Sequence, residues 1–164
     1  MDPLVKIITV DGYFSQEEAL RLTEMTENLN YEETEFGMEI SNFNMISWNS
    51  DNIFSTVLGK KLEILEEQSG IFRKPECFIH FEGFDELNEW IFAVSLRPST
   101  FNVFEHKSGC ETALDGYQHN YRNLFEWDLT INYLLKPGQG VFFRPWLFHS
   151  FDNGLIQIFR LKEI

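Results

Sequence analysis

The sequence predicts an α+β domain in which two helices precede a set of antiparallel strands. Helical spacing of apolar residues is confined to the first part of the chain, whereas from Cys77 onward apolar and polar residues alternate with a period of two. Phe is also frequent: 13 of the 17 Phe residues lie from Phe72 onward, and aromatic side chains favour half-buried pleated sheets. Because no helices are interleaved among the later strands, we expect an antiparallel sandwich, barrel or jelly roll.

The N-terminal segment predicts a strand followed by a helix. Residues 4–10, "LVKIITV", form a short apolar run that ends at the turn residues Asp11 and Gly12. The helix begins after Ser15, which can cap it, and Glu18 three residues later completes a capping box. One or two strands are expected within residues 36–48.

The spacing of apolar residues predicts a second helix. Ser50 or Asp51 can cap it, and apolar side chains recur at helical intervals from Phe54 to Leu65. We expect this helix to stop at Ser69-Gly70, where glycine can take the left-handed conformation that ends many helices.

The second half of the chain predicts about seven short strands separated by turn residues. An irregular polar and aromatic stretch, residues 107–124, interrupts them and is expected to be a long loop or a lid. The expected strands are 76–82, 90–97, 100–106, 125–135, 140–144, 147–152 and 155–161.

Length and charge limit the class of protein. The 164 residues fit a single domain, 1–164, that can bury a sizeable core. The net charge is −13, and 16 of the 26 acidic residues lie in residues 1–82, which disfavours a nucleic-acid partner. Cys77 and Cys110 are too few for a disulfide framework, so we expect a reduced, cytoplasmic setting. The apolar opening is too short for a signal peptide or a membrane span.

A histidine and an acid form the first candidate for a metal site. In "FIHFEGF", His80 and Glu82 are two residues apart on an expected strand, so their side chains point to the same face. An imidazole and a carboxylate placed in this way are two ligands of the two-histidine, one-carboxylate arrangement that holds non-haem iron. The tripeptide alone is weak evidence, because a solvent-facing strand end would have the same sequence.

The stretch "PGQGVFFRPWLFHSFDNGLIQIFRL" supplies two further candidates. His149 shares a face with Leu147 and Phe151, and a buried imidazole there needs a hydrogen-bond partner or a metal. Arg160 shares a face with Ile156 and Ile158; if that face is interior, the guanidinium demands an anion and suits a carboxylate. The alternative is an arginine exposed near the chain end.

The order His80-x-Glu82, then His149 behind a Pro-Gly-x-Gly turn, then Arg160 resembles the iron(II)/2-oxoglutarate-dependent oxygenase superfamily, most of all its prolyl-hydroxylase-like members. The opening "IITVDGYFSQEEALRLTE" is similar to the strand, turn and helix with which that family begins. The resemblance covers roughly residues 5–161.

The resemblance implies a double-stranded β-helix (jelly-roll, cupin-like) core with supporting N-terminal helices. It implies that iron(II) is held by His80, Glu82 and His149, and that Arg160 pairs with a carboxylate of 2-oxoglutarate. Tyr133 could hydrogen-bond the cosubstrate or be an ordinary core tyrosine, and no catalytic residue is expected beyond the metal ligands. The reaction implied is oxidative decarboxylation of 2-oxoglutarate to succinate and CO2, coupled to hydroxylation of a small-molecule, amino-acid or peptidyl substrate.

Several alternatives stay open at this point. His106, near a strand end, could be a metal ligand, and Arg144 and Arg97 could bind a second anion or face solvent. His119 could line a substrate opening. The chain could also be a cupin-type metal protein, since "HSFDN" has the His-x3-Asn spacing of a cupin motif, or a catalytically degenerate jelly-roll binding protein, with its aromatic residues at a homodimer interface.

Overall fold

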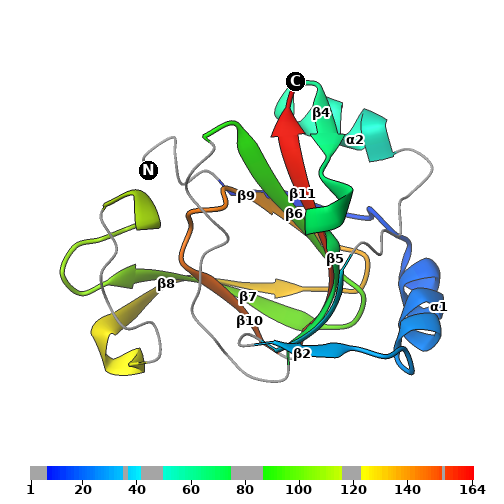
Figure 1. The fold of residues 1–164 in the computed structure, drawn as a ribbon, viewed down its shortest axis with the longest axis horizontal. Coiled ribbons are helices and arrows are strands. Elements are labelled where there is room, and N and C mark those ends of the chain that lie inside the picture. Colours follow the sequence, from blue (N-terminus) through cyan, green and yellow to red (C-terminus); the bar gives the residue numbers. More distant parts are fainter. Residues whose placement is uncertain (1–6, 35–36, 42–49, 75–86, 116–122, 153) are drawn as a thin grey trace.

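The structure is a computed structural model that describes residues 7–34, 37–41, 50–74, 87–115, 123–152 and 154–164. Two antiparallel sheets form its framework, with α1 at one end of the molecule (Figure 1). The elements in chain order are β1 (Ile8–Val10), α1 (Gln16–Thr26), β2 (Glu32–Thr34), β3 (Gly37–Ser41), α2 (Ser50–Leu58), β4 (Leu62–Ile64), η2 (Glu66–Gln68), β5 (Gly70–Lys74), β6 (Glu89–Ser95), β7 (Ser99–His106), η3 (Ala113–Asp115), η4 (Leu124–Glu126), β8 (Trp127–Leu135), β9 (Gly140–Phe143), β10 (His149–Asp152) and β11 (Gly154–Glu163).

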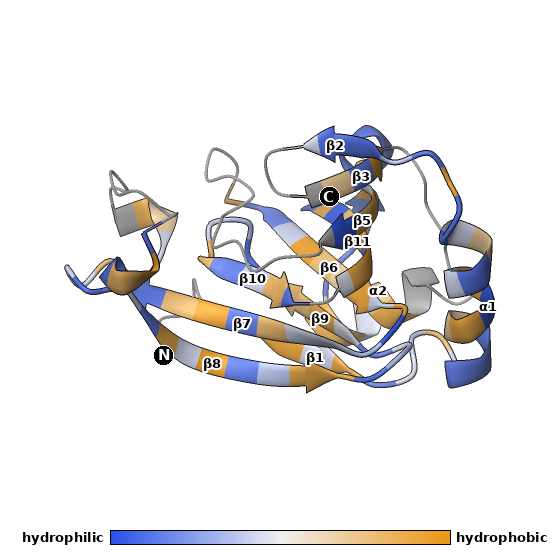
Figure 2. Ribbon diagram, turned by 90° about the horizontal axis from the view of Figure 1, so that it is seen from below, coloured by the Kyte–Doolittle hydropathy of each residue, from blue (hydrophilic) through white to orange (hydrophobic). Residues whose placement is uncertain are grey.

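The strand order is that of a jelly roll. Among the described residues, the larger sheet has the order β1-β9-β6-β11-β5-β3-β2, with β4 also paired to β11, and the smaller sheet has the order β10-β7-β8. From β6 onward the chain passes repeatedly between the sheets: β6, β9 and β11 belong to the larger sheet, and β7, β8 and β10 belong to the smaller one. In the view turned by 90°, β7 and β8 lie below β6 and β11 (Figure 2). The α+β jelly-roll prediction is confirmed.

Alternate residues of the central strands serve two different apolar cores. On β6, Trp90, Phe92 and Val94 pack with α1 and α2 on the outer face of the larger sheet. Ile91 and Ala93 face the other way, into the space between the two sheets, which we call the interior. The interior core is completed from both sheets by Phe101, Val103, Leu135, Val141, Phe143, Leu147, Phe151, Ile156 and Ile158.

The first helix forms as its sequence predicts. Ser15 caps α1 through a hydrogen bond from the Glu18 amide, and the Glu18 side chain accepts from the Ser15 amide, which completes the capping box. The strands predicted for residues 90–97 onward are also confirmed, with ends shifted by up to two residues. The strand predicted for residues 76–82 lies outside the described residues.

The predicted end of the second helix is wrong. Helix α2 stops at Leu58, and Gly59 follows with a φ of 67°, so it supplies the left-handed ending that was expected at Gly70. The helical spacing of apolar residues extends beyond Leu58 because Leu62 and Ile64 are also apolar. These two residues form β4, which pairs with the end of β11 and does not continue the helix. Gly70 instead begins β5.

An ion-pair cluster covers the outer end of the larger sheet. The guanidinium carbon of Arg144 lies 3.6 Å from the centre of the Trp90 ring, and Nη1 of Arg144 lies 3.6 Å from Glu163 Oε1. Trp90 Nε1 donates to Glu163 at 2.9 Å, and Lys60 Nζ lies 3.2 Å from the same carboxylate. Arg144 is thus largely buried on the outer face. The sequence analysis considered it as a binder of a second anion or as a solvent-facing residue, and neither describes this position.

The turn that contains Gly138 predicts a strong glycine requirement. Gly138 has a φ of 86°, and a Cβ there would overlap the carbonyl oxygen of Phe14. We expect Gly138→Ala to reduce the free energy of unfolding far more than Gly12→Ala, which has a φ of 67° with open space around its Cβ and should cost only about 1–2 kcal/mol. Urea unfolding of both variants measures the difference; equal losses would contradict it.

The cluster around Glu163 predicts an acid-dependent contribution to stability. Burial acts to raise the pKa of Glu163, but the hydrogen bonds from Trp90 and Lys60 and the charges of Lys60 and Arg144 hold it below its ordinary value of 4.5. The stabilisation is therefore present above the unfolded-state pKa and is lost as pH falls through the lower, folded-state pKa. We expect wild type to be more stable than Glu163→Gln at pH 7 and the difference to disappear in acid.

Urea unfolding of wild type and Glu163→Gln from pH 7 to pH 3 tests this expectation. The exposed Glu67→Gln is the control for loss of one surface carboxylate, and it should track wild type at every pH. A difference between wild type and Glu163→Gln that stays constant over this range would contradict the assignment.

Candidate active site

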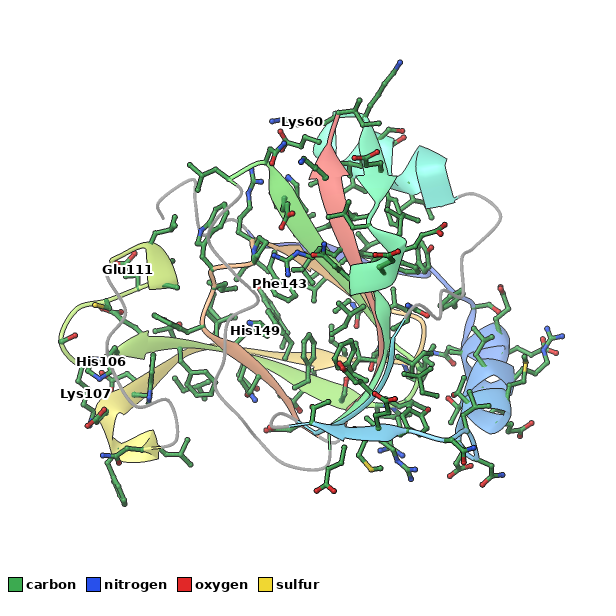
Figure 3. All side chains as sticks on the ribbon, in the orientation of Figure 1. Lys60, His106, Lys107, Glu111, Phe143 and His149 are labelled. Carbon is green, nitrogen blue, oxygen red and sulfur yellow. The ribbon has the colours of Figure 1, made fainter. Side chains whose placement is uncertain are left out.

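His149 lies in the interior of the jelly roll. It is the first residue of β10, is 0% exposed, and stands opposite Val103 of β7. Its imidazole is surrounded by aromatic rings, and Phe143 of the larger sheet lies near it (Figure 3). The centre of the imidazole lies 4.6 Å from the ring centre of Phe143, 5.8 Å from that of Phe151 and 6.0 Å from that of Phe101. The prediction that His149 shares an apolar, inward face is confirmed.

A backbone contact determines which nitrogen of His149 carries the proton. Nδ1 lies 2.8 Å from the carbonyl oxygen of Leu147. A carbonyl oxygen can only accept, so Nδ1 donates, and in the neutral imidazole Nε2 then carries the lone pair. A histidine ligand whose other nitrogen is held by a backbone carbonyl is typical of metal sites, because the contact fixes both the tautomer and the ring orientation. His149 therefore fits a metal ligand in its donor chemistry.

Arg160 lies on the interior face of β11 and is paired within the chain. Ile156 and Ile158, which share its face, both belong to the interior core, so the inward orientation considered from the sequence is confirmed. Oε2 of Glu89 lies 2.8 Å from both Nε and Nη2 of Arg160. The side chains are 18% and 7% exposed, for Arg160 and Glu89 respectively. The anion that the buried guanidinium demands is thus supplied by β6.

Glu89 is the site residue that the sequence analysis missed. It is the first residue of β6 and lies two residues before Ile91, so it shares the interior face. The sequence did contain a signal for it: Glu89 is an acid at the alternate position to Ile91 and Ala93, the apolar residues of this strand that face the interior. Its partner could not be found in this way, because the contact depends on the register in which Arg160 pairs with Ile91.

Tyr133 also belongs to the interior side of its strand. It stands opposite Phe101 in the β7–β8 pair, and Ile131 and Leu135 on the same face pack into the interior core. Its side chain is nevertheless 37% exposed. Tyr133 therefore lies on the interior face of β8, which ends the order β10-β7-β8, with part of its side chain exposed.

The other predicted metal ligands fall outside the described residues. His80 and Glu82 lie within residues 75–86, between two described parts of the chain. His119 is outside as well. Within the described ranges, no three histidine, cysteine or acidic residues come together in a way that could hold a metal ion.

His106 has a different environment from His149. It ends β7, is 6% exposed, and packs edge-on against Trp127 with ring centres 5.0 Å apart. Its Nδ1 lies 2.7 Å from the Ser108 hydroxyl and its Nε2 lies 3.4 Å from Glu126. Both nitrogens are thus engaged by polar side chains of nearby turns, an arrangement that stabilises the end of the strand.

A pocket of about 290 Å³ adjoins the interior core. Its walls include Val103, the residue opposite His149, and Leu147, whose carbonyl holds the imidazole. Glu105 and Glu111 contribute to its lining together with apolar side chains. The pocket therefore offers a small organic molecule a place lined by two residues that adjoin the candidate metal ligand, one by strand pairing and one by a hydrogen bond.

No protein-family model matches the sequence, and no curated protein matches it either. Across the described part of the chain, no helix is long and apolar enough to cross a membrane.

Several solved structures share the fold. HygX from Streptomyces hygroscopicus, with nickel, 2-oxoglutarate and hygromycin B bound, is similar with a TM-score of 0.63 at 10% sequence identity, over 98% of this chain and 83% of HygX. The alpha-ketoglutarate-dependent epimerase SnoN from nogalamycin biosynthesis gives 0.59 at 12% identity, over 98% and 79% of the two chains. An oxidoreductase of the 2OG-Fe(II) oxygenase family from Burkholderia pseudomallei gives 0.53 at 10% identity, over 94% and 82%. The chain therefore shares its jelly-roll fold with these proteins.

Proposed function

We propose that the chain is an iron(II)- and 2-oxoglutarate-dependent dioxygenase that acts on a small organic molecule. His80, Glu82 and His149 would hold the metal, and Arg160 would bind a carboxylate of the cosubstrate. Within the superfamily, the order of these residues in the sequence resembles the prolyl-hydroxylase-like members.

The observation that carries the proposal is the environment of His149. The imidazole is fully buried, its Nδ1 donates to the Leu147 carbonyl, and Nε2 is left with the lone pair that a metal requires. The surrounding phenylalanine rings restrict water and keep the side chain in one orientation. These features support a ligand role on a fold that, in the structurally similar HygX, is found with nickel and 2-oxoglutarate bound.

The remaining residues have supporting roles in the proposal. The metal, once bound, would supply the open coordination positions at which 2-oxoglutarate and O2 are activated. Arg160 would orient the cosubstrate by charge-assisted hydrogen bonds from the opposite sheet, and Tyr133 could donate a hydrogen bond to it from the smaller sheet. The substrate would lie in the pocket beside Leu147 and Val103.

A small-molecule substrate is favoured over a peptidyl one by two observations. The pocket has a volume of about 290 Å³, at the lower end of the range of small-ligand sites. HygX, the similar structure described above, contains the small molecule hygromycin B.

The pair between Glu89 and Arg160 favours a second candidate function. An arginine that is neutralised within the chain is less available to 2-oxoglutarate, as expected of a cupin-type or catalytically degenerate jelly-roll protein that binds another ligand. Metal binding without any response to 2-oxoglutarate would favour this alternative.

The His149 assignment predicts the effect of its removal. We expect anaerobic addition of iron(II) plus 2-oxoglutarate to raise the melting temperature of the wild-type protein, and addition of O2 to produce succinate slowly without substrate. His149→Ala should lose the metal-dependent part of both responses, because one of three ligands is missing. Calorimetric melts and succinate quantification measure them.

His106→Ala is the matched control, since it also removes a buried histidine from the smaller sheet. It should lower stability but retain the shift caused by iron(II) plus 2-oxoglutarate. If His106→Ala abolished the shift and His149→Ala did not, the ligand assignment would be wrong. Absence of any shift in wild type would count against the proposed function itself.

A further inference from the structure

We propose that Glu89 sets the carboxylate affinity of Arg160 by acting as an internal competitor for its guanidinium. The inference rests on the proposed function only in naming 2-oxoglutarate as the competing ligand. The competition itself concerns the guanidinium and any carboxylate that reaches it.

The contact geometry makes Glu89 a direct substitute for a bound carboxylate. A single oxygen, Oε2, accepts from both Nε and Nη2 of Arg160 at 2.8 Å. These two nitrogens form one of the two edges through which a guanidinium binds a carboxylate in a bidentate manner. Glu89 therefore occupies an edge that a carboxylate ligand would otherwise use.

The surroundings increase the electrostatic effect of Glu89. Ile91, Ile156 and Ile158 are apolar neighbours on the same interior face, and the Glu89 side chain is only 7% exposed. Charges interact more strongly where solvent is largely excluded. Besides Arg160, this face of β11 carries one more cation, Lys162, which stands directly opposite Glu89 in the strand pair.

An incoming carboxylate has two ways to bind, and Glu89 opposes both. If the ligand replaces Glu89, a nearly buried carboxylate loses its ion pair, which is costly. If the ligand joins Glu89 at the guanidinium, two negative charges come within a few ångströms of each other in a region of low dielectric constant. Removing the charge of Glu89 should therefore strengthen carboxylate binding.

Glu89→Gln is the variant that separates charge from position. The amide oxygen of glutamine can still accept from Nε, so the side chain of Arg160 keeps a partner while the competing charge disappears. We expect glutarate, which has two carboxylates but no oxo group for metal chelation, to bind this variant about tenfold more tightly than wild type, or more. Titration calorimetry of the metal-free protein with glutarate measures this.

Two further variants define the source of any gain. Glu163→Gln removes an equal charge from the same end of the larger sheet, but on the outer face, and should bind glutarate as wild type does. The double variant Glu89→Gln/Arg160→Gln should lose the gain, because the guanidinium is absent. If Glu89→Gln does not fold, Glu89→Asp withdraws the carboxylate by one methylene and should give a smaller gain of the same sign.

The outcomes separate this inference from the proposed function. Glutarate binding to the folded Glu89 variant that is no tighter than to wild type, or a gain that persists without Arg160, would overturn the inference. A gain for glutarate with no binding of 2-oxoglutarate to wild type or variant in the presence of nickel(II) would support the inference and overturn the proposed function. Nickel-dependent binding of 2-oxoglutarate to wild type, with no gain for either ligand in the variant, would overturn the inference alone.

Discussion

The burial of β6 and β11 on both faces is the constraint on which the rest of the structure depends. Every residue of β6, Glu89–Ser95, is buried, and so is β11 from Gly154 to Phe159. Strands buried on both faces can be apolar throughout, but any charge within them must have a partner close by. The charged residues of these strands accordingly lie near one end of the larger sheet, where Glu89 meets Arg160 and Glu163 meets its own partners.

Glu89 connects two charge clusters that lie on opposite faces of this sheet. Its side chain pairs with Arg160 on the interior face, while its backbone carbonyl accepts from Nη1 of Arg144 at 2.9 Å on the outer face. Arg144 in turn stacks on Trp90 and neighbours Glu163. One residue at the start of β6 therefore contacts an arginine on each face of the larger sheet.

Local patterns predicted the parts of the fold and site that depend on sequence neighbours alone. The capping box of Ser15 predicted the start of α1, and alternation predicted the interior orientation of His149. For Arg160, alternation predicted only that it shares a face with Ile156 and Ile158, and the structure shows that this face is interior. The end of α2 was not predictable from spacing, because the apolar residue Leu62 satisfies a helical period and also the pairing of β4 with β11. The choice between them is made by a strand almost one hundred residues later.

The partner of Arg160 was beyond the reach of the sequence for the same reason. A period of two indicates which face a residue occupies, but the residue that it meets depends on how two distant strands are registered. The sequence therefore indicated that Arg160 would need an anion if its face were interior, without indicating that the chain carries one at Glu89.

A buried arginine in a jelly-roll interior creates a choice between stability and ligand affinity. If the chain leaves the guanidinium for a ligand, the unliganded protein carries an uncompensated charge and is less stable. If the chain supplies a carboxylate, the unliganded protein is stabilised, and every anionic ligand must compete with that carboxylate. In this protein the chain supplies the carboxylate, because Arg160 is paired with Glu89. At His149, by contrast, the carbonyl of Leu147 accepts from Nδ1, and the lone pair of the neutral imidazole is therefore on Nε2. Internal contacts thus have opposite effects at the two residues. The contact with Leu147 orients His149 for a ligand role, whereas the contact with Glu89 opposes the binding of a carboxylate at Arg160.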